Sequence, residues 1–346
     1  MEEVRVTGNA QRRASVSDVA RVAGVSVGTV SNVLNRPDHV AAATRERVLA
    51  AIEQLSFVRN GSARQLRAGT ITTVGAIVLD IRNPFFVEVA RGIEDRLADA
   101  DHTLMLASSD DDPKREARYL RLFEEHGVSG MLVVPTGDDL DALAALAARG
   151  VHTVLLDQQS PTDALSSVAV DDVAGGALAG DHLVSLGHRQ ITMLNGPGTI
   201  RQCRDRLTGL RQAVTRHGLD PDAVVREVTL STLDAKGAAR AFAPLLESVE
   251  VPRAVFCIND LVAIGVQREI RRRRPELIGS IAIIGYDDIE VAAELATPLT
   301  SVRQPATEVG YRAADILLAR STSREPVVEQ VVFQPELVVR SSSVPA

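Results

Sequence analysis

The first side chains with an evident binding chemistry lie within residues 26–35. Asn32 carries an amide that can form two hydrogen bonds with the edge of an adenine, and Val27 offers methyl groups to the methyl of a thymine. Thr29 and Ser31 bring hydroxyls that suit phosphate oxygens, which fix the register of a protein on a duplex. We therefore expect base recognition through Asn32, worth about 1–3 kcal/mol for a good bidentate contact. The alternative for Asn32 is a solvated helix position.

Two short helices joined by a turn must position these side chains. Ser17 and Asp18 are expected to begin the first helix, and Gly24 can adopt the positive φ that ends it. Ser26 can cap the second helix, whose apolar residues recur at helical spacing. Two helices this small cannot bury a core alone, and residues 44–55 supply a third. Three such helices form a helix-turn-helix unit, whose second helix fits the major groove of DNA.

The sequence resembles the LacI–GalR family of bacterial transcription regulators at several motifs. The string DVARVAGVSVGTVSNVLN, followed by TRERVLAAIEQL and NGSARQLRAGT, is similar to the DNA-binding head and hinge of that family. GYDD at 285–288 and TPLTSVRQP at 297–305 resemble its sensor domain. Because these motifs occur in the family's order, a helical hairpin unrelated to nucleic acid is the weaker alternative.

The resemblance implies a helix-turn-helix head over residues 15–60 and a hinge helix over residues 61–70. Leu66 matches the apolar wedge that opens a base step in the minor groove and bends the duplex. A hinge this short is not stable as an isolated helix, so it should order when two copies pair on DNA; the alternative is a plain linker. The expected DNA-binding residues are Ser17, Ser26, Val27, Gly28, Thr29, Ser31, Asn32, Asn35, Ala63, Arg64 and Leu66.

Two features of the head depart from the family's pattern. Related regulators usually place longer or polar side chains where Val27 and Gly28 stand, so direct reading should depend on Asn32. Relatives also often have a serine cap before the third helix, where this sequence has alanines. Either Thr44 caps that helix instead, or the cap is missing at a cost of about 1 kcal/mol.

Charge is distributed unevenly along the 346 residues. The net charge is −7, yet residues 1–70 carry ten arginines against six acidic residues. A basic head on an acidic body is expected when only the head meets phosphate. Two cysteines are too few for a disulfide framework, no signal peptide is visible, and no apolar run suggests a membrane span. These features predict a cytoplasmic protein with a flexible tail over residues 1–14.

Beyond residue 70, short apolar runs alternate with helical segments. Such strands predict parallel sheets covered on both faces, in an α/β architecture of two doubly wound lobes that divide near residues 168–172. The expected strands are 74–80, 103–109, 130–135, 152–157, 190–196, 254–259 and 281–286. The expected helices are 85–100, 114–125, 140–148, 174–186, 204–217, 235–247 and 261–272.

The resemblance adds the fold of periplasmic sugar-binding proteins to residues 71–346, which would form an effector-binding and dimerisation domain. It implies that the segment 299–305 returns the chain to the first lobe and that 331–340 finish in the second. The first lobe would then comprise about 71–168 with 299–323, and the second about 169–298 with 324–346.

Ligands of such sheets bind where parallel strands end, which directs attention to the residues that follow each strand. The resemblance implies a small polyol between the lobes, most often a sugar or a nucleoside-like metabolite. Such a ligand needs carboxylates, amides and arginine in fixed positions. Phe85 and Phe86 are the obvious stacking platform, and the lack of an aromatic near Thr232 favours a smaller or more polar ligand. The expected effector-binding residues are Asn83, Phe85, Phe86, Asp157, Arg206, Asn259, Asp260 and Asp287.

Each of these residues also has a plain structural interpretation. Asp157 and Asp260 could be helix caps, and Arg206 could pair with Asp205 or another acid of its lobe. The histidines lack the spacing of a metal site, so no metal or cofactor is expected.

Three classes of function compete. A solute-binding protein for transport would need a signal peptide and would lack the head. A nucleotide-dependent enzyme would show a glycine-rich phosphate motif after its first strand, where this chain has IRNPFF; a nucleophile elbow is also missing. We predict a DNA-binding transcription regulator, most simply a repressor and not an enzyme, that binds a near-palindromic operator as a homodimer. A two-state closure of the lobes would switch its affinity, and neither the effector nor the sign of its action is predicted.

Overall fold

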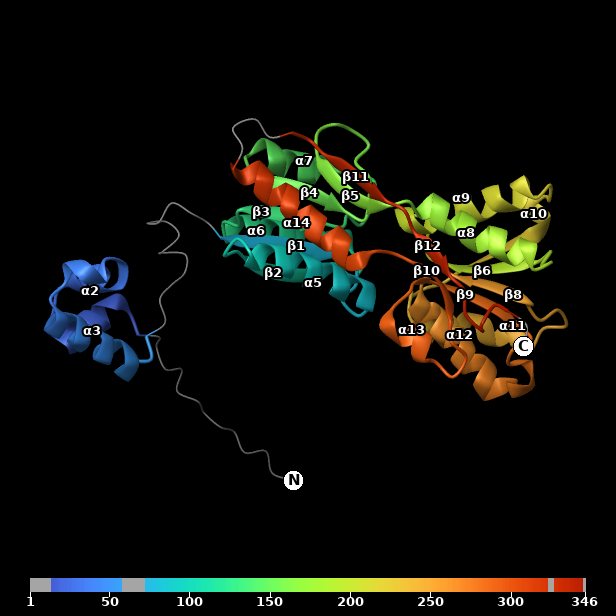
Figure 1. Ribbon diagram of the computed structural model, residues 1–346, viewed down its shortest axis with the longest axis horizontal. Helices are drawn as coiled ribbons and strands as arrows, with labels where there is room; N and C mark the ends of the chain where they lie inside the picture. The colour runs from blue at the N-terminus through green and yellow to red at the C-terminus, as the bar shows by residue number, and fades with distance from the viewer. Residues whose placement is uncertain (1–13, 58–71, 323–326, 345–346) are drawn as a thin grey trace, which may run out of the picture. The chain divides into compact units, whose positions relative to one another are not determined.

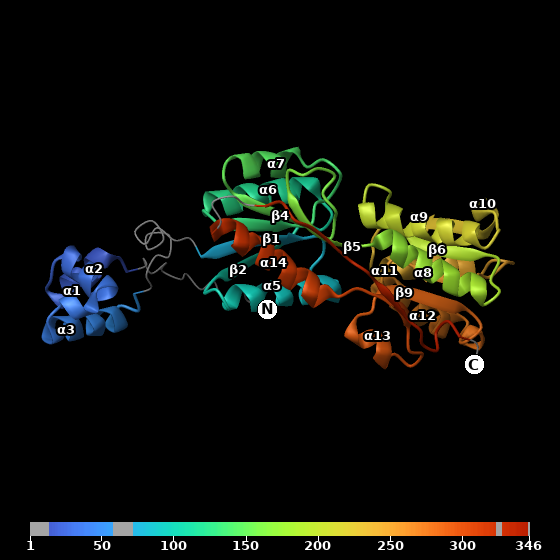
Figure 2. The ribbon, with the colours of Figure 1, turned by 45° about the horizontal axis from the view of Figure 1, so that its top comes forward.

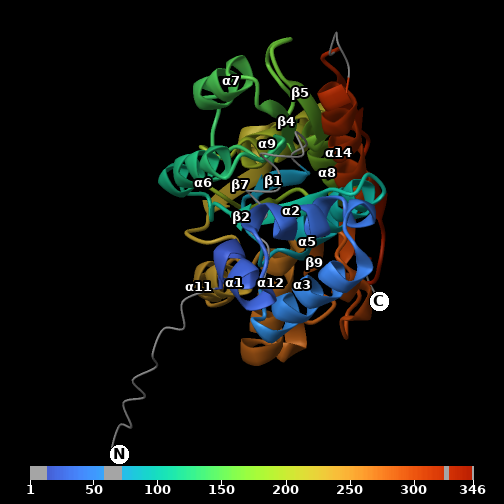
Figure 3. The same cartoon turned by 90° about the vertical axis from the view of Figure 1, so that its left-hand side faces the viewer.

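The computed structural model describes residues 14–57, 72–322 and 327–344, which form a head before residue 72 and a body after it. Three α-helices, α1 (Val16–Ala23), α2 (Val27–Asn35) and α3 (Ala42–Gln54), make up the head together with a short 3-10 helix, η1 (Pro37–His39) (Figure 3). The predicted hinge, with Ala63, Arg64 and Leu66, lies outside the described residues, as does most of the predicted tail.

The first helix begins one step earlier than the sequence analysis expected. Ser15 caps α1 in a reciprocal arrangement: its hydroxyl accepts from the backbone N–H of Asp18 at 3.2 Å, and the Asp18 carboxylate accepts from the backbone N–H of Ser15 at 2.9 Å. Ser17 is therefore an exposed residue inside the helix and not its start. Gly24 ends α1 with a φ of 64°, which confirms the predicted turn.

The third helix shows the missing cap. It begins at Ala42, two residues before Thr44, and its N-cap residue Ala41 offers no side-chain hydrogen bond. The small core of the head is built by one face of each helix and includes Val19, Val30 and Val48. These side chains are fully buried, which explains how three short helices hold together.

The first lobe of the body is a parallel sheet with helices on both faces (Figure 2). Its strands, in the spatial order β11-β5-β4-β3-β1-β2, are β1 (Thr73–Val78), β2 (Thr103–Ser108), β3 (Gly130–Val133), β4 (His152–Leu156), β5 (Ser166–Val170) and β11 (Gln330–Phe333). One face carries α5 (Pro84–Ala98) and α14 (Ala306–Thr322); the other carries α6 (Pro113–Glu125) and α7 (Asp141–Ala148). Each face has its own apolar core, as expected of near-continuous apolar strands.

The second lobe repeats this plan with one antiparallel edge strand (Figure 1). Its strands, in the order β12-β10-β9-β8-β6-β7, are β6 (Ile191–Asn195), β7 (Val225–Thr229), β8 (Ala254–Cys257), β9 (Ala282–Asp287), β10 (Thr300–Arg303) and β12 (Glu336–Val338). Its helices are α8 (Asp172–Ser185), α9 (Arg201–Arg216), α10 (Pro221–Val224), α11 (Ala235–Leu246), α12 (Asp260–Arg273) and α13 (Glu290–Glu294), with a 3-10 turn η2 (Pro275–Leu277).

The chain passes between the lobes three times, and two of the predicted segment assignments were wrong. The strand β10 does not return to the first lobe, because it pairs with β9 in parallel and buries Thr300, Ser301 and Val302 in the second. The strand β11 does not belong to the second lobe, because it pairs with β5 in the first. The chain does finish in the second lobe as predicted, because β12 pairs with β10 there. The crossings therefore follow β5, β10 and β11, and place α14 on the first lobe.

Candidate effector cleft and nucleic-acid interface

The second helix of the head divides into a buried and an exposed face. Val30 and Val33 point into the core, whereas Val27, Gly28 and Asn32 are exposed. Val27 leaves 47% of its surface in solvent, although it continues the apolar spacing of the helix. The three residues predicted to face base edges therefore share the exposed face of α2, the placement that a reading helix requires.

The polar residues around this face are partly engaged within the head. Ser26 caps α2 as predicted, since its hydroxyl accepts from the backbone N–H of Thr29 at 3.1 Å. The amide of Asn35 donates to the Ser31 hydroxyl at 3.2 Å. A phosphate contact by these groups would compete with, or share, hydrogen bonds that already fix the start and end of the helix.

A cavity of the body lies between the lobes, where the strands of both sheets end. Its volume is about 250 Å³. Seven of the eight predicted effector-binding residues line it: Asn83, Phe85, Phe86, Asp157, Arg206, Asn259 and Asp287. Asp260 does not, although it directly follows Asn259 in the sequence. The carboxyl-end rule of parallel sheets thus identified the cleft, because the loops that follow the strands meet there.

Asp287 joins the two lobes at the base of the cleft. It ends β9 with a φ of 106°, and its carboxylate accepts from the Asn83 amide of the first lobe at 2.9 Å. The Gln304 amide, in the crossing after β10, donates to its other oxygen at 2.8 Å. Burial raises the pKa of Asp287 to about 6, because the partners that stabilise its charge do not offset the loss of water.

Arg206 is held from three sides inside the second lobe. Its Nε donates to Asp172 at 2.7 Å, and Nη1 donates to the backbone carbonyl of Ile258 at 2.6 Å. Its guanidinium lies 3.5 Å from the centre of the Tyr286 ring. A Cβ on Gly176 would lie 2.0 Å from the carbonyl oxygen of Arg206, so glycine is needed where α8 and α9 approach. These contacts fix the guanidinium at the cleft wall.

Asp157 approaches the cleft from the first lobe. The Gln202 side chain of the second lobe donates to both its backbone carbonyl, at 2.8 Å, and its carboxylate, at 2.9 Å. The second carboxylate oxygen, Oδ1, is buried and has no hydrogen-bond partner among the described residues. Burial, with the charge of Asp172, raises the pKa of Asp157 well above its usual range. Asp157 is thus a cleft residue and not the helix cap that the sequence left open.

Asn259 lines the cleft, whereas its neighbour Asp260 does not. Asn259 caps α12 through Oδ1, which accepts from the N–H of Val262 at 2.9 Å, so its role is at least partly structural. The prediction of Asp260 as an effector residue was wrong. Its carboxylate accepts from the Ser301 hydroxyl at 2.7 Å and the Ile289 N–H at 2.9 Å, which ties α12 to β10 away from the cleft.

The residues that hold the predicted ones in place were not predicted from the sequence. Asp172 and Tyr286 contact Arg206, and Gln202 contacts Asp157, although the two members of each pair are far apart in sequence. Asp172 has the appearance of an ordinary acidic residue in a first helical turn, and Tyr286 that of one more apolar residue of a strand. Phe85 and Phe86 are the predicted apolar wall, with ring centres 5.0 Å apart in an edge-to-face arrangement.

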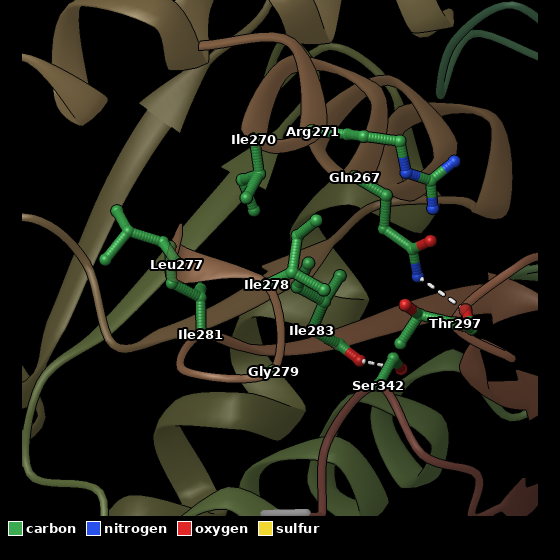
Figure 4. Close-up of a pocket in the computed structure, with 10 residues that line it drawn as sticks. All are labelled: Gln267, Ile270, Arg271, Leu277, Ile278, Gly279, Ile281, Ile283, Thr297 and Ser342. Carbon is green, nitrogen blue, oxygen red and sulfur yellow. Dashed lines mark hydrogen bonds between the residues drawn. The ribbon is translucent and has the colours of Figure 1, made fainter. Parts of the chain in front are cut away.

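Another pocket among the described residues, lined by side chains of α9 and by Pro221, has a volume of about 540 Å³. A second pocket, on the outer side of the second lobe, has a volume of about 20 Å³, and its polar groups Gln267 and Ser342 already donate to backbone carbonyls (Figure 4). No group of metal-binding side chains occurs among the described residues. Of the helices described, none has the length and apolar character to cross a bilayer. Cys203 lines the cleft, but burial raises its pKa to about 12, so it remains a thiol.

The fold and the cleft define a class of protein: a two-lobed ligand-binding body that carries a helix-turn-helix head. Comparison with known families makes this specific. Residues 15–60 match the family described as bacterial regulatory proteins, lacI family, and residues 71–335 match the periplasmic binding proteins and sugar binding domain of the LacI family. The chain belongs to the LacI family. It is accordingly a DNA-binding transcription regulator and not an enzyme.

Individual relatives cover almost the whole chain. The ribose operon repressor of Escherichia coli K12 is 35% identical over 95% of this chain and 100% of its own length. The transcriptional repressor PurR of Photobacterium profundum is 32% identical over 95% of this chain and 98% of its own length. A crystal structure of the lac repressor dimer bound to operator and an anti-inducer is 28% identical and covers 96% of this chain and 100% of that chain, with a TM-score of 0.76.

Proposed function

We propose that this protein is a transcription repressor whose operator affinity is set by a small hydroxyl-rich metabolite bound between the lobes. The observation that carries the proposal is the cleft itself. Carboxylates and amides from one lobe face a fixed guanidinium from the other, and both sets surround a volume of about 250 Å³. A sugar or a nucleoside-like ligand supplies the hydroxyls that such groups bind.

The apolar wall favours a ligand with one stacked face. Phe85 and Phe86 provide that wall on the first lobe, and on the second Thr232 and Leu233 stand where a facing aromatic would be needed. The name of the ribose operon repressor agrees with a ligand of monosaccharide size. A nucleobase held between two rings finds less support in this lining.

The contacts that cross the cleft suggest how a ligand would act. Asn83 and Asp287 join the lobes at its base, and the Arg204 guanidinium binds both oxygens of Asp138 at 2.8 and 2.7 Å on its rim. A ligand that prefers one closure angle shifts the protein toward that state only by its difference in affinity for the two states. In the proposed mechanism, this shift changes whether two hinge segments pair on DNA.

The DNA partner is proposed to be a near-palindromic operator bound by a homodimer in the cytoplasm. Val27, Gly28 and Asn32 would face its bases, with Ser26, Thr29, Ser31, Ser17 and Asn35 on or near the backbone and Ala63, Arg64 and Leu66 in the minor groove. The relation to the lac repressor dimer on its operator supports this arrangement. Because the proposed target is DNA, we place the action of the protein in the cytoplasm.

The test is a selection of full-length protein on duplexes with a randomised core, followed by anisotropy titrations and sedimentation analysis. Enrichment of a two-fold symmetric site, bound by two chains, is expected. Addition of the metabolite that raises the melting temperature of the protein should then change operator affinity. A protein that enriches no symmetric site at low salt would contradict the proposal.

A further inference from the structure

The charges that line the cleft are unbalanced. The lining includes five aspartates but two arginines, Arg82 and Arg206. Both guanidiniums already have carboxylate partners: Arg82 donates from Nε and Nη2 to the two oxygens of Asp80, each at 2.9 Å, and Arg206 donates to Asp172 at 2.7 Å. Neither arginine therefore offers a ligand an unpaired positive charge.

Two carboxylates of the lining have amide partners in place of cations. Asp287 accepts from Asn83 and Gln304, and Asp157 accepts from Gln202. Burial raises the pKa of both groups, and each also feels the charge of nearby carboxylates. The lining thus holds more carboxyl groups than arginines, although burial keeps part of their negative charge from developing.

One of these carboxylates also lacks a hydrogen bond. Asp157 leaves 6% of its surface exposed, and its Oδ1 has no partner among the described residues. A buried acceptor without a donor is costly, so a ligand that supplies a hydroxyl or amine hydrogen there gains affinity. A ligand that places a second anion there meets repulsion in a site with little water to screen it.

We propose that the cleft selects against anions: its effector is a neutral or amine-bearing polyol that donates a hydrogen bond to Asp157 Oδ1, and phosphorylated or carboxylated sugars are excluded. The inference rests on the proposed function, which places the effector in this cleft. It extends that function by specifying the charge of the ligand. Discrimination arises from repulsion as well as from the favoured contact.

Matched pairs of ligands test the proposal on the full-length protein. The probes are D-ribose with D-ribose 5-phosphate, and D-glucose with D-glucose 6-phosphate, D-gluconate and D-glucosamine, measured by thermal unfolding and calorimetry at constant ionic strength. The neutral or amine member of a pair is expected to bind at least about tenfold more tightly than its anionic partner. An anionic member that binds equally well or better overturns the proposal, and so does the lack of any response.

Substitutions then locate the discrimination. Asp157→Asn keeps the size of the side chain and removes its charge, so the ratio of the two dissociation constants should shrink several-fold. Asp111→Asn, at an exposed lining position, should shrink it less and does not depend on a buried group. Asp181→Asn is the control, because Asp181 pairs with Arg216 and lies outside the cleft lining. An unchanged ratio in both cleft variants contradicts the inference.

Operator binding separates this inference from the proposed function. The same preparations are titrated with the selected operator duplex. Preference for an anion, with operator binding intact, overturns the charge selection alone. Failure to bind any symmetric duplex, whatever the ligand result, counts against the proposed function instead.

Discussion

The head and the body present their candidate contact residues in opposite ways. The head places Val27, Gly28 and Asn32 on one exposed helix, close together in sequence. The body gathers residues such as Asn83 and Asp287, which are 204 positions apart and buried, into a hydrogen bond of 2.9 Å. Recognition on α2 can therefore change with little effect on folding, whereas each charge in the cleft is also part of the stability of the body.

The largest effect is expected from a substitution that breaks the buried ion pair between Asp172 and Arg206. Asp172→Ala leaves the Arg206 guanidinium buried without its carboxylate, and we expect the body to lose about 3–5 kcal/mol of unfolding free energy. Denaturant unfolding followed by circular dichroism measures this loss. The control Asp181→Ala removes a carboxylate with 43% of its side chain exposed and should cost less than about 1 kcal/mol. Similar losses in the two variants would show that burial does not set the difference.

The pH dependence of stability tests the contribution of a buried cleft residue, Asp287. Its folded pKa, about 6, lies above the usual value of 3.8. Between these values the folded state binds more protons than the unfolded state, so stability falls as pH rises from about 4 to about 6. This group contributes up to about 3 kcal/mol to the fall. Asp287→Asn should flatten the slope in that window, and a slope equal to that of the parent would refute the assignment.

For α2, whose candidate contact residues are exposed, we expect a large effect on DNA recognition and a small effect on stability. Asn32→Ala should lower the preference for one base pair in each half-site by about 1–3 kcal/mol and should change stability by less than about 0.5 kcal/mol. A selection from randomised duplexes gives the preference, and thermal unfolding gives the stability. Unaltered base preference would assign Asn32 to the solvated face and not to reading.

The smallest effect compares two helix starts within the head. Ser15 caps α1, whereas Ala41 leaves α3 without a side-chain cap. Ala41→Ser should therefore raise the stability of the head by about 0.5–1 kcal/mol, while Ser15→Ala lowers it by a similar amount. Thermal unfolding of both variants measures the two changes, and a loss of stability in Ala41→Ser would contradict the interpretation of α3 as uncapped.

The sequence predicted most of the helices and strands, but it did not predict the lobes to which β10 and β11 belong. Apart from the predicted hinge, which lies outside the described residues, every expected strand and helix occurs within a few residues of its predicted bounds. Buried parallel strands are predictable in this way because they leave near-continuous apolar runs. The short strands β5 and β7 and the helices α10, α13 and α14 were missed. The pairing of β10 and β11 was assigned to the wrong lobes, since periodicity describes which face of a strand is buried and not which neighbour it pairs with.

Prediction of the cleft residues from the sequence has a similar limit. Strand-end positions identified Asp157, Arg206 and Asp287 because topology alone brings such residues together. Asp260 was included for the same reason, yet its carboxylate turns to Ser301. Which of two adjacent polar residues faces the cleft depends on backbone dihedral angles, such as the φ of 106° at Asp287, that no composition rule encodes.

The three passages of the chain between the lobes also have a consequence for biosynthesis. Neither sheet is complete until β11 and β12, at residues 330–338, have left the ribosome, because each supplies an edge strand to a different lobe. A nascent chain that stops earlier would expose the open edges of β5 and β10, which invite pairing with other chains. Truncations that remove residues 330–338 are therefore expected to lower solubility through both lobes at once.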